Sequence, residues 1–252
     1  MKIAVVTGAS SGLGREFVRV LTEKRPDLEE IWVLARRVNL LEDLKSEFGK
    51  KIRAVPMDLT DETAQNRYVN LLNQEKAEIS LLINNAGFGK IGDFDKLSSA
   101  DSSGMIRLNC EALTVFTAVS LPFMKENGEI INTCSIASFS PNARMSVYSA
   151  TKAYVMSFSR SLRLELKSRK INVLAVCPGP MDTEFLPVAG IEKGTSKTFD
   201  LLPRVQTKKV ALGSIKASRR KRGVYTPGFF YKFYRIVAKI LPHSIVMRMS
   251  AT

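Results

Sequence analysis

The sequence is poor in the residues that bind metals and form disulfides. It contains one histidine, His243, and three cysteines, Cys110, Cys134 and Cys177, among 252 residues. The cysteines are odd in number, lie in apolar surroundings and lack the spacing of metal ligands, so we expect reduced structural thiols. Because no histidine, cysteine and acid cluster has ligand spacing, the sequence predicts no metal site.

Long hydrophobic runs and linkers are also missing. No uninterrupted apolar stretch reaches the roughly 20 residues that cross a bilayer. Met1 and Lys2 lead directly into an apolar strand and leave no room for a signal peptide, so we expect a cytoplasmic protein. No segment rich in proline, glycine or serine divides the chain, and 45% of its residues are hydrophobic, which suits one large domain with a buried core.

Acidic residues are absent from the C-terminal part. Residues 201–252 contain twelve lysines and arginines and no acid, whereas residues 1–200 contain 26 basic and 24 acidic residues. Most of the net charge of +14 therefore lies in the C-terminal part. The body of the chain resembles an ordinary soluble domain, and the tail needs its own explanation.

Apolar runs and amphipathic stretches alternate along the body. After a first strand that ends at Thr7, strand-like runs occur at residues 31–35, 52–57, 81–84, 129–135 and 171–177, with helical stretches between them. This alternation predicts an α/β fold with a doubly wound parallel sheet and helices on both faces. Residues 223–226 can add a short seventh strand.

A glycine-rich loop follows the first strand in Thr7-Gly8-Ala9-Ser10-Ser11-Gly12-Leu13-Gly14. Glycines at these positions allow a tight turn, a close backbone approach to a pyrophosphate and close packing of the next helix. The N–H groups at the start of that helix would face the phosphates. The alternative is an ordinary strand-to-helix turn, but the loop lies where a dinucleotide-binding fold begins. We expect cofactor contacts from Gly8, Ser10, Ser11, Gly12, Leu13 and Gly14.

Two arginines, Arg36 and Arg37, follow the second strand. In a dinucleotide-binding fold this position lies beside the adenosine ribose, where an acid would pair with a 2′-hydroxyl. Arginines can hold a 2′-phosphate instead, so the sequence favours NADP(H) over NAD(H). The alternative is a pair of exposed arginines at a helix start.

Tyr148 and Lys152 are four residues apart in a helical stretch, so both side chains project from one face. A free tyrosine has a pKa of about 10, which a neighbouring ammonium and a cationic nicotinamide would lower. The tyrosine could then donate or accept a proton. Such a pair also occurs by chance on surface helices.

Together these motifs resemble the short-chain dehydrogenase/reductase family over at least residues 3–183. The pattern T-G-x-x-x-G-x-G is matched from Thr7 to Gly14, N-N-A-G by residues 84–87, and P-G-x-x-x-T from Pro178 to Thr183. The resemblance implies a Rossmann-type sheet of about seven strands. It places the family's catalytic tetrad on Asn109, Ser135, Tyr148 and Lys152.

The resemblance also implies a role for each position. Tyr148 would exchange a proton with the substrate oxygen, Ser135 would stabilise that oxygen, and Lys152 would hold the nicotinamide ribose. Asn109 would fix a water connecting Lys152 to solvent. The remaining cofactor contacts would come from Asp58 at the adenine, Asn85 at the adenosine side, and Met181 and Thr183 at the carboxamide. Asp58 could instead cap the next helix.

Residues 184–203 contain apolar side chains among glycines, including Phe185, Ile191 and Phe199, and predict a movable lid over the substrate. The tail at residues 227–252 follows a domain at residues 1–226 and begins with an amphipathic helix. Lys232, Arg235 and Lys239 form one stripe of that helix, and apolar residues fill most of its remaining circumference. Packing against the body or a second subunit, an interfacial membrane helix, and nucleic-acid contact are three explanations, and the sequence holds no nucleic-acid recognition motif.

We therefore expect an NADP(H)-dependent oxidoreductase acting on a partly apolar carbonyl or alcohol. The alternative is a catalytically silent NADP(H)-binding protein that acts through its basic tail. Expected partners are the small-molecule substrate and further copies of the chain in a homodimer or higher homo-oligomer. Peripheral membrane contact through the tail is left open, and no nucleic acid is expected.

Overall fold

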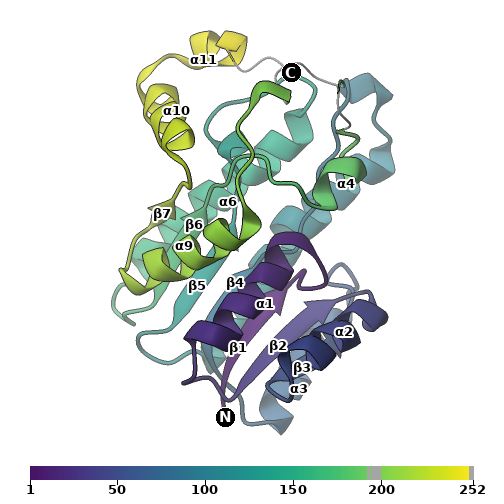
Figure 1. Ribbon diagram of the computed structural model, residues 1–252, viewed down its shortest axis with the longest axis vertical. Helices are drawn as coiled ribbons and strands as arrows, with labels where there is room; N and C mark the ends of the chain where they lie inside the picture. The colour runs from purple at the N-terminus through teal and green to yellow at the C-terminus, as the bar shows by residue number, and fades with distance from the viewer. Residues whose placement is uncertain (192–193, 195–199, 250–252) are drawn as a thin grey trace.

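A seven-stranded parallel sheet forms the centre of the structure (Figure 1). The computed structural model describes residues 1–191, 194 and 200–249. Neighbouring strands pair in the order β3-β2-β1-β4-β5-β6-β7, and every pairing is parallel. The strands are β1 (Lys2–Thr7), β2 (Glu30–Ala35), β3 (Ile52–Pro56), β4 (Glu78–Asn84), β5 (Glu129–Thr133), β6 (Asn172–Val176) and β7 (Val224–Tyr225). The predicted sheet of about seven strands is confirmed.

The strand order reverses beside β1, which pairs with β2 on one side and with β4 on the other. The chain therefore winds away from β1 in both directions. Loops that leave β1 and β4 at their carboxyl ends diverge and open a crevice there. The glycine-rich loop lies at this switch point, so the topology brings the first motif to the position where dinucleotides bind.

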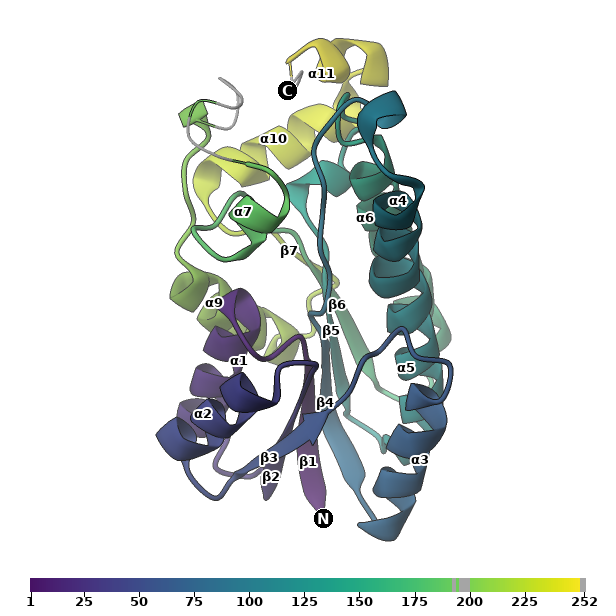
Figure 2. The same ribbon diagram turned by 90° about the vertical axis from the view of Figure 1, so that its right-hand side faces the viewer.

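Helices cover both faces of the sheet, as Figure 2 shows. One face carries α1 (Gly12–Lys24), α2 (Val38–Phe48) and α9 (Thr207–Arg219), and the other carries α3 (Ala64–Gln74), α5 (Leu113–Ser120) and α6 (Ser146–Glu165). The chain reaches α5 through α4 (Ser99–Ile106) and a π-helical turn, η2 (Arg107–Ala112). Short 3-10 turns are η1 (Phe94–Lys96), η3 (Leu121–Phe123) and η4 (Ile136–Ser138).

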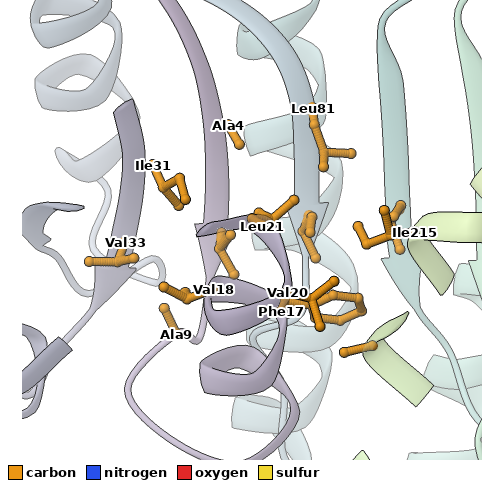
Figure 3. Packing of buried hydrophobic residues seen from close by; sticks show 14 of the residues in the cluster. Ala4, Ala9, Phe17, Val18, Val20, Leu21, Ile31, Val33, Leu81 and Ile215 are labelled. Carbon is orange, nitrogen blue, oxygen red and sulfur yellow. The ribbon is translucent and has the colours of Figure 1, made fainter. Parts of the chain in front are cut away.

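The core on one face forms around α1 (Figure 3). Leu13, Phe17, Val20 and Leu21 recur at helical spacing and are all buried, as the apolar pattern predicts. They belong to one cluster with strand residues such as Ala4 and with Ile215 of α9. Burial stabilises the fold by about 1.5–3 kcal/mol for each large apolar side chain. This packing fixes the start of α1 against the sheet.

A buried arginine ties together the amino ends of the strands. Arg25, whose side chain is 6% exposed, donates to Asp27 at 2.8 Å, to Glu129 at 3.1 Å and to Ser80 at 3.0 Å. The hydrogen bond from Arg25 holds the pKa of Asp27 well below its usual range, and Lys2 adds to the effect. The network connects the end of α1 with β4 and β5, so it stabilises the edge of the sheet opposite the crevice.

Three helices lie beyond the carboxyl ends of the strands: α7 (Phe185–Val188), α10 (Phe229–Ile240) and α11 (His243–Met249) (Figure 2). The first expected explanation of the tail is confirmed in part, because α10 packs on the body through Tyr231 and Ala238, both buried. No helix in the described part of the chain combines the length and the hydrophobicity needed to cross a bilayer.

Candidate active site

The glycine-rich loop has a backbone conformation that residues other than glycine rarely adopt. Gly8 and Gly12 have φ values of +64° and +52°, in the left-handed region that favours glycine. A Cβ on Gly8 would lie 2.7 Å from the Cα of Ala86, and a Cβ on Gly14 would lie 2.1 Å from the carbonyl oxygen of Gly8. The loop therefore lies against the sheet, and the start of α1 faces the crevice without an intervening side chain.

Thr7 and Asn85 hold this loop in place. The hydroxyl of Thr7 accepts hydrogen bonds from the N–H groups of Asn85 at 3.0 Å and Ala86 at 3.1 Å. The Asn85 amide donates to the carbonyl oxygens of Thr7 at 3.3 Å and Gly8 at 3.2 Å, and accepts from Thr133 at 3.2 Å. Asn85 lines the cleft as expected, but its side chain links the ends of β1, β4 and β5, a positioning role that the sequence did not reveal.

An anion-binding corner lies beside the loop. The Arg37 guanidinium donates to the hydroxyls of Ser10 at 3.1 Å and Ser11 at 3.0 Å, and to the carboxylate of Glu184 at 2.7 Å. The hydrogen bond from Arg37, with a further one from Ser11, lowers the pKa of Glu184. Glu184 therefore stays ionised at neutral pH and holds a negative charge beside two hydroxyls, an arginine and a helix N-terminus. Sequence analysis missed Glu184 as a contact of this corner because its partner is 147 residues away.

Arg36 and the other expected cofactor residues also line the cleft, except Gly14, which lies against the carbonyl oxygen of Gly8 and does not line it. The Asp58 carboxylate accepts from the Thr60 N–H at 2.9 Å and from its hydroxyl at 2.7 Å, so it closes a turn before α3 (Ala64–Gln74) while facing the crevice. The methyl and Cβ of Thr183 lie 3.3 Å from where a Cβ on Gly12 would be. The segment after β6 thus reaches across to the glycine-rich loop.

The four expected catalytic residues come together from three parts of the chain: η2, the end of β5 and α6. Ser135 follows β5. Tyr148 and Lys152 lie one turn apart on α6, and both are buried. Tyr148 is hydrogen-bonded to Ser135. The Lys152 ammonium lies 5.7 Å from the centre of the Tyr148 ring and donates to the carbonyl oxygen of Thr133 at 3.0 Å. Ser135, Tyr148 and Lys152 therefore line the same cleft.

Asn109 belongs to the π-helical turn η2 and is 1% exposed. Its side chain accepts from the N–H of Phe88 at 3.0 Å and donates to the carbonyl oxygen of Phe88 at 2.9 Å and to Thr151 at 3.1 Å. A Cβ on Gly87 would lie 2.8 Å from Asn109 Oδ1 and 3.5 Å from Lys152 Nζ. Asn109 and Lys152 therefore meet beside Gly87, whose missing side chain leaves the space between them open.

Burial of Tyr148 acts against the expected lowering of its pKa. Removal from water raises the pKa of Tyr148, and the hydrogen bond from Ser135 only partly opposes this effect. Burial also lowers the pKa of Lys152, because a buried ammonium is disfavoured. The groups that shift the Tyr148 pKa do not include Lys152, whose ammonium donates to the carbonyl oxygen of Thr133. The phenol is therefore protonated at neutral pH.

One continuous cleft of about 930 Å³ joins the anion-binding corner to the catalytic residues. Its far end is apolar, with Phe185 centred 5.6 Å from the Tyr148 ring. Of the expected lid at residues 184–203, Glu184–Ile191, Gly194 and residues 200–203 are described, and Phe199 lies outside the described residues. The tail completes the wall: Phe230, Tyr231 and Tyr234 of α10 line the same cleft, which the sequence did not indicate.

Comparison with known proteins agrees with this geometry. The model of the short chain dehydrogenase family matches residues 2–191. A probable NADP-dependent dehydrogenase of Haemophilus influenzae is 33% identical over 214 residues, which cover 82% of this chain and 84% of that protein. The NADP-dependent 3-hydroxy acid dehydrogenase of Salmonella typhi is 33% identical over 204 residues, covering 79% of this chain and 81% of that protein.

Solved structures show the same fold. A short-chain dehydrogenase from Sphingobium yanoikuyae in complex with NADPH has 27% identity and a TM-score of 0.77, with 97% of this chain and 98% of that chain covered. A closed serine dehydrogenase complexed with NADP⁺ has 28% identity and a TM-score of 0.79, covering 90% of this chain and 94% of that one. The family model and the relatives in sequence agree, and the chain belongs to the short-chain dehydrogenase family.

Proposed function

We propose that this chain is an NADP(H)-dependent oxidoreductase that transfers a hydride between the nicotinamide and a carbonyl or secondary alcohol carbon. One observation carries the proposal. Ser135, Tyr148 and Lys152 meet at one end of an apolar cleft, and the anion-binding corner around Arg37 lies at the other. A dinucleotide is long enough to connect these two ends, and the relatives named above include enzymes described as NADP-dependent.

The residues at the anion-binding corner fit NADP(H). The Arg37 guanidinium and the Ser11 hydroxyl both bond one carboxylate, that of Glu184, and Arg37 also donates to the Ser10 hydroxyl. A 2′-phosphate has the same charge sign and more acceptor oxygens, so it can replace this carboxylate. Gly8 and Gly12 would leave room for the pyrophosphate, and Arg36 would add a second cation.

When bound, NADPH supplies the hydride. The chain's own residues donate the proton to the substrate oxygen and stabilise the charge that develops on it. Tyr148, whose phenol is protonated at neutral pH, donates its proton to that oxygen in the reduction direction. Ser135, hydrogen-bonded to Tyr148, stabilises negative charge developing on the same oxygen. Lys152 would bind the ribose, and Asn109 would position the water beside Gly87.

The substrate end of the cleft favours a partly apolar molecule. Its walls include Met145, Phe185, Leu186, Ile191 and Tyr231, which come from three separate segments. Such walls stabilise an alkyl or ring portion of the substrate by the hydrophobic effect and leave the carbonyl facing Tyr148 and Ser135. The substrate class is therefore a ketone or aldehyde with an apolar body, or the corresponding alcohol.

The experiment is a panel of apolar ketones, aldehydes and alcohols assayed by the absorbance of NADPH. Tyr148→Phe should reduce turnover by at least about 100-fold and leave NADPH affinity within about twofold, because only the acid/base hydroxyl is removed. Tyr154→Phe on the same helix is the matched control, since the Tyr154 hydroxyl bonds Thr114 at 2.7 Å outside the cleft.

Two outcomes separate the alternatives. Turnover by Tyr148→Phe near the parent rate would remove Tyr148 from the mechanism. If the parent binds NADPH but turns over no compound in the panel, the catalytically silent alternative is favoured.

The assembly and the cellular location of the protein are two further parts of the proposal. We propose a homodimer or higher homo-oligomer, and a cytoplasmic location, for a chain whose described helices cannot cross a bilayer. Sedimentation velocity measures the oligomeric state, and fractionation of cells measures the location. A monomer at micromolar concentration would contradict the oligomer.

A further inference from the structure

Helix α10 is held on the body by one face. Tyr231 is 1% exposed and donates its hydroxyl proton to the carbonyl oxygen of Pro203 at 2.7 Å. Its ring occupies the space that a side chain on Gly179 would take, since a Cβ there would lie 2.3 Å from the ring. Ala238, two turns further along α10, is 4% exposed. These contacts fix the orientation of the helix and therefore which residues point away from the body.

The opposite face of α10 is apolar and exposed. It consists of Phe229, Phe233, Ile236 and Ile240, which are 86%, 59%, 56% and 73% exposed; we call these four residues the outer face. At about 100° per residue they share an arc of roughly 60°, on the side of the helix opposite Tyr231 and Ala238. Large apolar side chains grouped in this way mark a surface that contacts something other than water.

Cations lie along one flank of the outer face. Lys232 and Lys239 lie together on one flank of it and are exposed. Residues 201–252 carry twelve lysines and arginines and no acid. Helix α11 adds Ile245 and Met247, 46% and 40% exposed, beside the basic Arg248. The surface thus combines apolar groups with charge of one sign.

We propose that the outer face of α10 docks on an anionic membrane surface, with the helix lying parallel to the bilayer plane. A helix of this kind inserts its apolar face to a depth of about 5–10 Å, and flanking lysines pair with anionic headgroups. The twelve residues of α10 suit a helix that lies on the bilayer rather than one that crosses it.

A second copy of the chain fits this surface less well. If two outer faces met across a twofold axis, Lys232 and Lys239 of each copy would lie near the same residues of the other. No acid in residues 201–252 could neutralise them. A surface rich in anionic lipid headgroups supplies the opposite charge and the apolar environment together.

The test uses the full chain with vesicles of phosphatidylglycerol or of phosphatidylcholine. The parent should sediment with phosphatidylglycerol vesicles and much less with phosphatidylcholine, and added salt should weaken binding. Phe229→Ser combined with Phe233→Ser should lower the partition coefficient by at least about tenfold. Lys232→Gln and Lys239→Gln should each lower it by about fivefold.

Phe94→Ser is the matched control, because Phe94 is 66% exposed on η1 (Phe94–Lys96) and is not part of the tail. It should bind vesicles like the parent, and far-ultraviolet circular dichroism checks that every variant is folded. Absence of parent binding to phosphatidylglycerol, or unchanged binding by the double serine variant, overturns the proposal. If the parent does not bind vesicles and the double serine variant no longer forms oligomers, the outer face binds a second copy of the chain instead.

Discussion

The anion-binding corner makes the sharpest prediction about cofactor preference. The change is Arg36→Asp combined with Arg37→Ala, with Arg37→Ala alone as the simpler variant. Arg37 bonds Ser10, Ser11 and Glu184, and the 2′-phosphate of NADPH would take the place of Glu184. NADH has no phosphate at this position, so the two cofactors should respond differently.

The expected size follows from the contacts. A hydrogen bond to a charged group contributes about 1.5–3 kcal/mol. Binding of the phosphate breaks the Arg37–Glu184 pair, whose side chains are 46% and 56% exposed; such an exposed pair contributes at most about 1 kcal/mol. The net loss for Arg37→Ala is therefore about 0.5–3 kcal/mol, or roughly 2- to 140-fold in NADPH affinity. The aspartate in the double variant adds repulsion and increases the loss.

Fluorescence titration of NADPH and NADH measures both affinities on the same preparation. NADH affinity should stay within about twofold of the parent, because the removed side chain had no phosphate partner in that complex. Arg19→Ala is the matched control, since Arg19 on α1 (Gly12–Lys24) pairs with Glu47 at 3.1 Å and does not line the cleft. Equal losses for NADPH and NADH would refute the assignment of this corner to the 2′-phosphate.

Two other variants test Glu184 in this corner and the Arg25 network at the opposite edge of the sheet. Glu184→Gln should tighten NADPH binding by up to about fivefold, because the phosphate no longer competes with a carboxylate for Arg37; weaker binding in the same titration would contradict this. Arg25→Met should lower the free energy of unfolding at neutral pH by about 3–5 kcal/mol in urea titrations, because Glu129 is left buried without its partner. Arg25 lowers the pKa of Asp27, so the ionised Asp27 stabilises the folded parent relative to the variant. This contribution to the free energy of unfolding should be complete above pH 3.8, the ordinary pKa of an aspartate, and should decrease as the pH falls below it. An advantage that grows on acidification would contradict the network.

Local patterns were enough to predict the strands, the sheet and the positions of the main motifs. The apolar spacing of Phe17, Val20 and Leu21 predicts the buried face of α1 because a helix places such residues together regardless of the rest of the chain. The glycine-rich loop is equally local, since the left-handed backbone of Gly8 and Gly12 is a property of a few adjacent residues. The alternation of strands and helices then restricts the topology.

Long-range contacts and burial could not be predicted in this way. Glu184 meets Arg37 only because the segment after β6 (Asn172–Val176) folds back over the glycine-rich loop. The direction of the Tyr148 pKa depends on how much water reaches the phenol, whereas the sequence shows only a lysine four residues away. The tail was recognised as unusual from its composition, but its contribution to the cleft through Tyr231 depends on the gap beside Gly179.

The Arg37–Glu184 pair has a consequence for the order in which ligands bind. Glu184 immediately precedes α7, and the next residue, Phe185, lies against the ring of Tyr148. A phosphate that displaces Glu184 therefore frees the segment that covers the substrate end of the cleft. NADPH should bind first and ease substrate entry by up to about fivefold, the equivalent of one exposed ion pair. NADH leaves the pair intact, so with that cofactor the two ligands should bind in random order.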